Sequence, residues 1–336
     1  MQTFEIQNTF GLDALTLTER PDPSPGDGQV LIKLRAVSLN YRDLMVVKGL
    51  YNPNQPLPLI PFSDGVGEVI AVGEGVTRVK IGDRVAGTFF QNWIDGELTA
   101  EKAQSALGGA IDGLLTQYAV LHEDGVVHVP QHLTDEAAAT LPCAAVTAWN
   151  ALITSGGVKA GDTVLVQGTG GVSIFALQFA QLLGARVIAT SSSDEKLERM
   201  RQLGASDTIN YKQTPQWGKT AKELTDGVGV DYVVEVGGAG TLNQSLRAIR
   251  HGGQISLIGV LTGGSGEIST ASILRKNVRL QGIYVGSRQM FEAMNRAIAL
   301  HKLQPIVDRV FSFQEAPQAL KYMESGAHFG KICIRF

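Results

Sequence analysis

A glycine-rich turn between an apolar strand and a helix constrains the fold of this chain more than any other feature. Residues 163–167 form a short apolar run, residues 168–173 read Gly-Thr-Gly-Gly-Val-Ser, and apolar side chains recur at helical spacing over residues 174–183. A second apolar run follows at residues 186–190. Glycines in such a unit let the backbone approach a pyrophosphate, and the helix N-terminal amides face its charge. The alternative is a turn that only joins strand and helix. The residues expected at a dinucleotide are Gly168, Gly170, Gly171 and Val172.

The alternation of strand and helix repeats through the middle of the chain. Further helices are expected at residues 194–203, 219–225 and 242–249, each between apolar runs. The expected strands cover residues 163–167, 186–190, 207–210, 231–236, 253–259 and 278–284. Strands joined by crossover helices predict an α/β fold with a Rossmann doubly wound parallel sheet.

The two ends of the chain follow a different pattern. Residues 30–37, 68–72 and 117–120 alternate apolar and polar side chains, which is typical of half-buried strands. Strands at 311–313 and 331–335 flank a helix at 316–324, so the last part of the chain returns to the style of the first. We therefore expect a nucleotide-binding domain at residues 131–304, inserted in a β-rich domain made of residues 1–130 and 305–336.

Composition excludes several classes of protein. The 336 residues carry 29 Lys and Arg against 32 Asp and Glu, a net charge of −3, which does not suit a nonspecific nucleic-acid binder. Only Cys143 and Cys333 occur, which excludes a disulfide framework and a zinc site of several thiolates. No apolar run is long enough to cross a bilayer, and the first residues lack the pattern of a signal peptide, so we expect a soluble, cytoplasmic protein without membrane or nucleic-acid partners.

One segment interrupts the β-rich first third. Residues 92–110 contain helix formers at 97–104 and follow the aromatic residues Phe89, Phe90 and Trp93, which we expect to be exposed. The segment is either a lid over a pocket or an ordinary surface excursion.

The end of the second strand of the nucleotide domain bears on the choice of cofactor. A carboxylate about 20 residues after the glycine turn would bind the ribose 2′-hydroxyl of NAD and repel the 2′-phosphate of NADP. This chain has Ser191 and Ser192 there, and Lys196 and Tyr211 are close enough in the pattern to reach a phosphate. The following acids, Asp194 and Glu195, weaken this argument for NADP, and the alternative role for both is to begin a helix as favourable N-terminal charges. The pattern favours NADP over NAD.

Motifs spread along the whole chain resemble the medium-chain dehydrogenase/reductase superfamily, and within it the zinc-free quinone oxidoreductase (zeta-crystallin-like) branch. The motifs that carry this resemblance are residues 40–43 with 49–51, 61–69, 82–85, 141–143 with 147–149, 168–172 and 330–331. The resemblance implies a GroES-like catalytic domain built from both chain ends, with substrate and nicotinamide meeting in the interdomain cleft. It also implies a homodimer or homotetramer formed through the Rossmann sheets.

The positions that bind zinc in relatives differ in this chain. Asn40 and Ser63 stand where zinc-dependent relatives have a Cys and a His, and only Cys143 remains at the third ligand position. The cysteine cluster of the structural-zinc lobe is also missing between residues 80 and 120. Because a catalytic zinc needs three protein ligands, we expect no zinc. We also expect Cys143 to be a small buried residue rather than a reactive thiol.

The missing ligands favour a reaction that needs no Lewis acid. Hydride addition to an enone or quinone spreads the developing charge over a conjugated system, so hydrogen-bond donors can suffice. By resemblance the pocket is lined by Asn40, Tyr41 and Tyr51, with Asn40 at the nicotinamide ribose or the substrate oxygen and Tyr51 as a donor to a carbonyl. The alternatives are that Asn40 only caps a helix and that Tyr51 is a packed loop aromatic. Asp43 is expected to be structural.

The resemblance also implies further nucleotide contacts, although each strand end could be ordinary sheet termination. These are Thr147, Gly237, Gly259, Val260, Ile283, Tyr284, Val285 and Lys331. The function expected is an NADPH-dependent reductase of activated C=C bonds or quinones. The alternatives are a metal-free alcohol dehydrogenase acting on an alcohol and its aldehyde or ketone, and a nucleotide-binding protein with little turnover.

Overall fold

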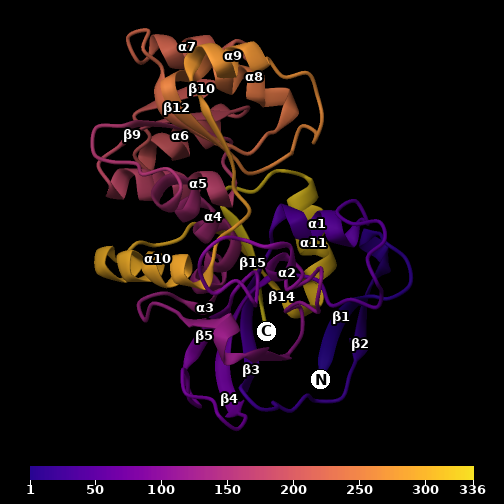
Figure 1. Cartoon of the computed structure of the whole chain (residues 1–336). Coiled ribbons are helices and arrows are strands. Elements are labelled where there is room, and N and C mark those ends of the chain that lie inside the picture. The colour runs from indigo at the N-terminus through magenta and orange to yellow at the C-terminus, as the bar shows by residue number, and fades with distance from the viewer. The chain divides into compact units, whose positions relative to one another are not determined.

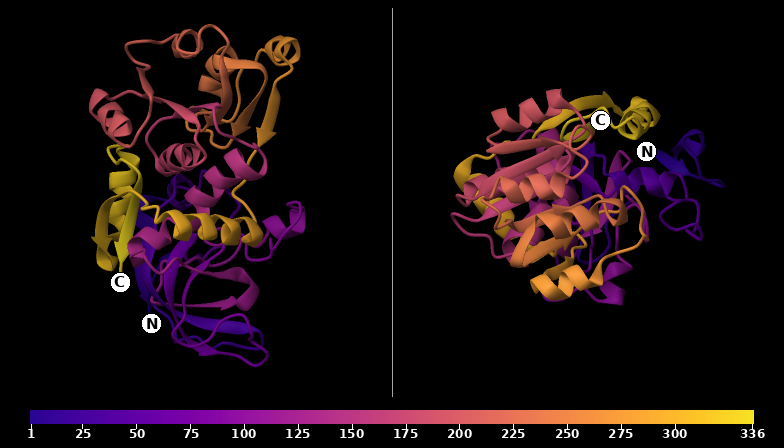
Figure 2. Two further views of the ribbon diagram at one scale, coloured as in Figure 1. Left: turned by 90° about the vertical axis from the view of Figure 1, so that its left-hand side faces the viewer. Right: turned by 90° about the horizontal axis from the view of Figure 1, so that it is seen from above.

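The computed structural model describes all residues, 1–336, and the chain divides into two compact units (Figure 1). The terminal unit joins Met1–Val146 to Gly286–Phe336, and the central unit is Thr147–Val285. Both chain ends lie in the terminal unit, as Figure 2 shows. No helix is both long and apolar enough to span a membrane.

The terminal unit is built on a seven-stranded sheet in the order β14-β15-β3-β4-β5-β7, with β6 paired to β3. C-terminal β15 pairs antiparallel with N-terminal β3, which closes the unit around a core drawn from both ends of the chain (Figure 1). Its strands are β1 Gln2–Ile6, β2 Leu15–Glu19, β3 Gln29–Ser38, β4 Asp64–Val72, β5 Arg84–Gly87, β6 Tyr118–His122, β7 Val126–His128, β14 Val307–Ser312 and β15 Lys331–Arg335. Its α-helices are α1 Tyr41–Val47, α2 Ala100–Ala103, α3 Asp135–Ala139, α10 Arg288–His301 and α11 Ala316–Glu324, and its short 3₁₀ and π segments are η1 Leu12–Ala14, η2 Glu123–Gly125, η3 Leu141–Ala145 and η5 Phe313–Glu315.

The central unit is the predicted doubly wound sheet. Its six strands are all parallel, in the order β10-β9-β8-β11-β12-β13, so the predicted fold class is confirmed. Helices α5 and α6 cover one face and α7, α8 and α9 the other (Figure 1). The strands are β8 Thr163–Gln167, β9 Arg186–Ser191, β10 Asp207–Asn210, β11 Val230–Glu235, β12 Ile249–Leu257 and β13 Arg279–Gly282. The helices are α5 Gly171–Leu182, α6 Asp194–Gln202, α7 Trp217–Glu223, α8 Ala239–Ala248 and α9 Thr270–Lys276. They are preceded by α4 Val146–Trp149, whose first residue belongs to the terminal unit, and by the π-helical η4 Asn150–Thr154.

The boundaries between the units differ from the expected residues 130 and 305. Helix α3 packs against β3, β4 and β15, and α10 packs against β7, so both helices belong to the terminal unit. Helix α10 was not predicted at all. Its buried residues Phe291, Met294 and Ile298 have helical spacing, and the Ser287 hydroxyl caps its first turn.

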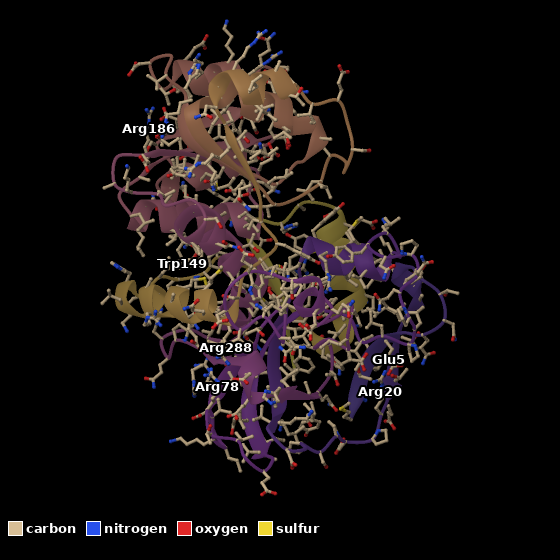
Figure 3. All side chains as sticks on the ribbon, viewed as in Figure 1. Glu5, Arg20, Arg78, Trp149, Arg186 and Arg288 are labelled. Atoms are coloured by element: carbon tan, nitrogen blue, oxygen red, sulfur yellow. The ribbon has the colours of Figure 1, made fainter.

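An ion-pair network fixes the start of α10 in the terminal unit. Arg288 Nη1 lies 2.6 Å from Asp124 Oδ1, and Arg78 Nη2 lies 2.9 Å from Glu292 Oε1. Arg78 and Arg288, both labelled in Figure 3, therefore join α10 to the loop around η2.

The segment from Phe89 to Ala110 is packed, contrary to the expectation of exposed aromatics. Phe89, Phe90 and Trp93 are 2%, 1% and 5% exposed, and their rings contact one another edge to face. The backbone N–H groups of Arg288 and Gln289 donate to the carbonyls of residues 93 and 94, which ties the segment to α10. The aromatic cluster is therefore the segment's own small core, and only a single helical turn, α2, forms in it.

Candidate active site and nucleotide-binding residues

In the terminal unit, Asn40 begins the helix that follows β3. It occupies the N-cap of α1, and its backbone N–H donates to Asp43 Oδ2 over 2.8 Å. Asp43 is completely buried, and this burial raises the pKa of its carboxyl to about 6 against the opposing charge of Arg42. Asp43 therefore has the structural role expected from the sequence, capping the helix that carries Asn40.

Four residues from three other segments form a hydrogen-bonded cluster with Asn40. Lys331 Nζ donates to Asn40 Oδ1 over 2.5 Å, and Asn40 Nδ2 donates to Ser63 Oγ over 3.3 Å. Ser63 Oγ donates in turn to Asp64 Oδ1 over 2.7 Å, and the backbone N–H of Cys143 donates to Asp64 Oδ2 over 3.1 Å. The structure thus brings together Asn40, Ser63 and Cys143, the positions matched to zinc ligands, and adds Asp64 and Lys331 to them.

The electrostatics of this cluster follow from burial. Burial raises the pKa of the Asp64 carboxyl, while the Lys331 ammonium and donated hydrogen bonds oppose that shift. Burial also raises the pKa of the Cys143 thiol, and the negative charge of Asp64 acts in the same direction. Both effects favour the neutral thiol, although Cys143 is partly exposed and not buried as expected.

These residues do not fit a catalytic zinc ion. A zinc site needs three anionic or imidazole ligands, whereas the three matched positions offer an amide, a hydroxyl and a thiol with a raised pKa, and Asp64 is the cluster's only carboxylate. The side-chain oxygen of Asn40 is the atom that would bind a metal ion. It already accepts a hydrogen bond from the Lys331 ammonium. No group of three or more His, Cys, Asp or Glu side chains in the chain is arranged to hold a metal.

The two tyrosines expected at the pocket are partly accessible. Tyr41 is 46% exposed and Tyr51 is 43% exposed. The guanidinium of Arg42 lies 5.2 Å from the Tyr51 ring centroid and 5.0 Å from that of Phe89, and Arg42 Nη1 donates to the Leu107 carbonyl over 2.6 Å. Arg42 therefore fixes the Tyr51 ring against the packed segment through cation–π contacts.

In the central unit, the glycine turn is shaped to take a phosphate. Gly168 adopts φ +69°, and Gly170 is the N-cap of α5, so the first amides of that helix point out of the turn. A Cβ built on Gly168 or Gly170 has no heavy atom within 4 Å, so the space beside the backbone is open. Open space at a helix N-terminus fits a pyrophosphate.

The end of β9 carries hydroxyl groups in place of an acidic residue. The Tyr211 backbone N–H donates to the Ser191 carbonyl over 3.0 Å, which places both residues at the same sheet edge. Ser193 Oγ accepts from the Lys196 backbone N–H and caps α6. The nearest acid, Asp194, accepts from Asn210 Nδ2 at 2.7 Å and Gln213 Nε2 at 2.9 Å, so its carboxylate is engaged by β10 and the loop after it.

A buried carboxylate that the sequence analysis missed organises the same edge of the sheet. Glu235, at the end of β11, is completely buried. Its Oε1 accepts from the N–H groups of Gly237 and Gly238 at 2.9 and 3.0 Å and from Thr241 Oγ1 at 2.5 Å. Its Oε2 accepts from Gln167 Nε2 at 2.7 Å and from the Ser245 hydroxyl. Since Gln167 immediately precedes Gly168, Glu235 joins the glycine turn to the turn after β11.

The segment after β13 contains a strained residue. Val285 adopts φ +57°, a conformation that β-branched residues rarely tolerate, and is 5% exposed. Asn150 Nδ2 donates to the Val285 carbonyl over 2.8 Å, and Asn150 Oδ1 accepts from Ser155 Oγ over 2.8 Å. Asn150, not anticipated from the sequence, thus holds the backbone that was expected to bind the carboxamide.

The other nucleotide residues expected from the sequence lie at the ends of β11, β12 and β13 and in α4. Gly237 and Gly259 allow close packing, because a Cβ on either would lie 2.2 or 2.4 Å from a neighbouring atom. Thr147 and Ile283 are buried, whereas Val260 and Tyr284 are 56% and 43% exposed. Lys331 is the exception, because it belongs to the terminal unit, where its ammonium has two acceptors, Asn40 Oδ1 and the Leu39 carbonyl.

Two family models match successive parts of the chain. The alcohol dehydrogenase GroES-like domain matches residues 26–131, and the zinc-binding dehydrogenase domain matches residues 171–299. A zinc-type alcohol dehydrogenase-like protein of Schizosaccharomyces pombe is 48% identical over 97% of this chain and 96% of its own length. The chain belongs to the medium-chain dehydrogenase/reductase superfamily and is an oxidoreductase.

The named activities of the relatives vary. An acryloyl-coenzyme A reductase of Metallosphaera sedula is 30% identical over 94% of this chain and 95% of the relative. A quinone oxidoreductase of Sus scrofa is 30% identical over 88% of both. Small-molecule oxidation or reduction is common to these relatives, and their substrates differ.

Solved structures share the fold over the whole chain. A Sinorhizobium meliloti 1021 structure has a TM-score of 0.92 at 42% identity, covering 100% of this chain and 98% of the other. An NAD-dependent alcohol dehydrogenase has a TM-score of 0.92 at 33% identity, and a mycobacterial protein complexed with NADPH has 0.83 at 27%, each with full coverage of both chains. These neighbours support binding of a pyridine nucleotide by this chain. One of them is named as NAD-dependent and the other is complexed with NADPH.

Proposed function

We propose that this protein is an NADPH-dependent reductase that transfers hydride to an activated C=C bond or a quinone without a metal ion. The observation that carries the proposal is the Asn40, Ser63 and Cys143 cluster, because its donor atoms suit hydrogen bonding to an oxygen and not zinc ligation. Relatives named quinone oxidoreductase and acryloyl-coenzyme A reductase support this reaction class.

The proposed roles follow from the chemistry of conjugate reduction. NADPH, when bound, supplies a hydride to the β-carbon of the acceptor, and the electron pair of the C=C bond moves onto the carbonyl oxygen. Asn40 Nδ2 and the Tyr51 hydroxyl are the donors proposed for that oxygen, and Tyr41 lines the pocket beside them. A proton from water then completes the product. Donors positioned before the reaction stabilise the enolate without reorganising.

The nucleotide contacts proposed on the central unit keep the positions expected from the sequence. The glycine turn binds the pyrophosphate, and Ser191, Ser192, Lys196 and Tyr211 bind the adenosine ribose and its 2′-phosphate. The remaining contacts proposed are Thr147, Gly237, Gly259, Val260, Ile283, Tyr284 and Val285.

A substrate panel tests the proposed function. NADPH oxidation is followed with quinones, enones, aldehydes and ketones, and alcohol oxidation is followed with NADP, each repeated with the non-phosphorylated nucleotide. The proposal expects kcat/KM for enones or quinones to exceed that for simple ketones. The alternative, a metal-free alcohol dehydrogenase, is favoured by relatives of that name. Faster turnover of an alcohol and its ketone would establish the alternative.

The purified protein is expected to contain far less than one zinc per chain. The donor set around Asn40 lacks the ligands for it, and relatives' cysteine cluster has no counterpart between residues 80 and 120. Elemental analysis and assays in a strong chelator check this prediction. Near one zinc per chain, together with activity lost on chelation, would contradict it.

NADPH is expected to bind about 10- to 100-fold more tightly than NADH. A charge-assisted contact to the 2′-phosphate contributes about 1.5–3 kcal/mol, and no carboxylate at the end of β9 opposes it. Titration of both nucleotides measures the ratio. The double variant Lys196→Ala with Tyr211→Phe should lose the preference, while exposed Lys219→Ala should keep it. Equal affinities in the wild-type protein would refute the assignment.

Tyr51→Phe is expected to lower the hydride-transfer rate about 100-fold and leave NADPH affinity unchanged. A hydroxyl that donates to the developing enolate acts in the chemical step, and the Phe ring keeps the cation–π contact with Arg42. Single-turnover rates at saturating NADPH give the comparison, with Tyr118→Phe in β6 as the control. An unchanged rate would remove Tyr51 from the mechanism.

We also propose that the protein is a homodimer or homotetramer formed through the central sheet. Strand β13 is an edge strand whose four residues are all exposed, and an edge with unpaired backbone groups is a template for another strand. Light scattering should give a mass two or four times 35.9 kDa. A monomer at micromolar concentration would exclude the proposal.

A further inference from the structure

The hydrogen bond from the Lys331 ammonium determines which way the side-chain amide of Asn40 is oriented. Lys331 begins β15, is 4% exposed, and its Nζ lies 2.5 Å from the Leu39 carbonyl oxygen and 2.5 Å from Asn40 Oδ1. An ammonium group has hydrogen-bond donors and no acceptor. A flipped amide would set its NH₂ group against these donors in a buried site, so the oxygen of Asn40 must face Lys331.

The rest of the cluster follows from that orientation. Asn40 Nδ2 donates to Ser63 Oγ, and the single hydroxyl proton of Ser63 is directed to Asp64 Oδ1. Each hydrogen bond therefore runs in the same direction, from the Lys331 ammonium to the Asp64 carboxylate. Hydrogen bonds aligned in this way polarise one another, which makes the Nδ2 hydrogens of Asn40 stronger donors.

We infer that Lys331 is a positioning residue, which holds the Asn40 amide so that its Nδ2 group, which faces Ser63 and Asp64, also donates to the substrate oxygen. This inference rests on the proposed function, because it assigns Asn40 Nδ2 to the oxygen that gains charge during hydride transfer. Lys331 acts through Asn40 and does not itself touch the nucleotide or the substrate.

The alternative role for Lys331 is a contact with the nucleotide phosphates, as expected from the sequence. Two of its three donors are committed to acceptors inside the terminal unit, and its charge balances the buried carboxylates of Asp43 and Asp64. A phosphate contact would have only the third donor of an ammonium that is 4% exposed. A positioning role predicts that Lys331 variants change the rate of hydride transfer, whereas a phosphate contact predicts that they change NADPH affinity.

A double-mutant cycle of Asn40→Ala and Lys331→Met separates the two roles. Hydride transfer is measured in single turnovers with the best acceptor that the wild-type protein reduces, and NADPH dissociation constants and unfolding temperatures are measured for every variant. Each single variant should slow hydride transfer about 10- to 100-fold with less than about a threefold change in NADPH affinity. The double variant should be no slower than Asn40→Ala, because Lys331 acts only through Asn40.

Lys331→Gln is the second variant, in case the loss of the hydrogen bonds to Leu39 and Asn40 prevents folding in Lys331→Met. Its neutral amide can still donate to Asn40 Oδ1, so a positioning role keeps the rate within about tenfold of wild type. Exposed Lys219→Met controls for a general loss of charge.

Three results would overturn the inference. The first is a double variant in which the rate losses of Asn40→Ala and Lys331→Met multiply. The second is a tenfold or greater loss of NADPH affinity in Lys331→Met or Lys331→Gln. The third is an unchanged rate of hydride transfer in both Lys331 variants. If the wild-type protein reduces enones or quinones and the variants give any of these three results, the proposed function still stands. A wild-type protein that reduces no acceptor of the panel overturns both.

Discussion

Gly170→Asp is expected to abolish NADPH binding, with at least a 100-fold loss of affinity, while the protein stays folded. In the absence of nucleotide the side chain meets no obstacle, because a Cβ at Gly170 has no heavy atom within 4 Å and the residue's φ is −79°. Asp is also a preferred N-cap residue, and its charge is favourable at the N-terminus of α5. The same charge lies where the pyrophosphate must bind, so it excludes the ligand by size and by repulsion.

Two measurements separate binding from folding in this variant. Nucleotide titration should show the loss of affinity, and denaturant unfolding should differ from wild type by no more than about 1 kcal/mol. Gly170→Asn is the matched control, since it has nearly the same size and capping ability without the charge, and it should bind NADPH more tightly than Gly170→Asp. Wild-type affinity in Gly170→Asp would mean that the pyrophosphate does not occupy this turn.

Gly170 suits this test because Gly237 and Gly259 are packed and Gly168 has a positive φ of +69°. A Cβ at Gly259 would lie 2.4 Å from the Val236 carbonyl oxygen, and one at Gly237 would lie 2.2 Å from Thr241 Oγ1. Substitution at either position therefore damages the turn itself, so a loss of binding there would not locate the ligand.

Local sequence signals predicted the elements of the central unit well. Strands Thr163–Gln167 and Asp207–Asn210 have the expected bounds, and so do the helix Ala316–Glu324 and the strand Lys331–Arg335 of the terminal unit. Each is a short apolar or amphipathic run bounded by Gly, Pro or a capping residue, so the information lies within a few neighbouring positions.

The predictions failed where packing between distant segments decides the outcome. Phe89, Phe90 and Trp93 looked exposed because their loop has no periodic pattern, yet they are buried against one another and held by backbone bonds to α10. Helix α10 did have a signal, in Ser287 at its N-cap and the spacing of its apolar residues. Its packing on β7, which moves the unit boundary to residue 285, could not be read from that signal.

The candidate site was predicted only in part, because local motifs mark some of its residues while others come from distant segments of the chain. Asn40 and the glycine turn were recognised from motifs, and Ser63 from the ligand position that it matches. The partner of Asn40, Lys331, is 291 residues away in the chain, and Glu235 is 68 residues from Gln167. Nothing local marks a buried charge as the organiser of a site, so both roles required the structure.

Glu235→Gln is expected to lower the unfolding free energy of the central unit by about 2–4 kcal/mol and to weaken NADPH binding. The carboxylate accepts from five donors, and a glutamine presents its own NH₂ group to two or more of them. Gln167 cannot turn to compensate, because its Oε1 accepts from the N–H groups of Val236 and Gly237. A donor then faces a donor in a buried site.

The fluorescence of Trp217, which is 5% exposed in the core of the central unit, can follow this loss during denaturant unfolding. Glu198→Gln is the control, because Glu198 is on the surface and its ion pair with Arg201 contributes little, so that variant should stay within about 0.5 kcal/mol of wild type. NADPH affinity should fall in Glu235→Gln even at temperatures where the variant is folded. Glu235 holds the turns that follow β8 and β11, the neighbouring strands between which the strand order of the sheet reverses. Wild-type affinity in a destabilised variant would confine Glu235 to folding, and wild-type stability would show that the five donors find other acceptors.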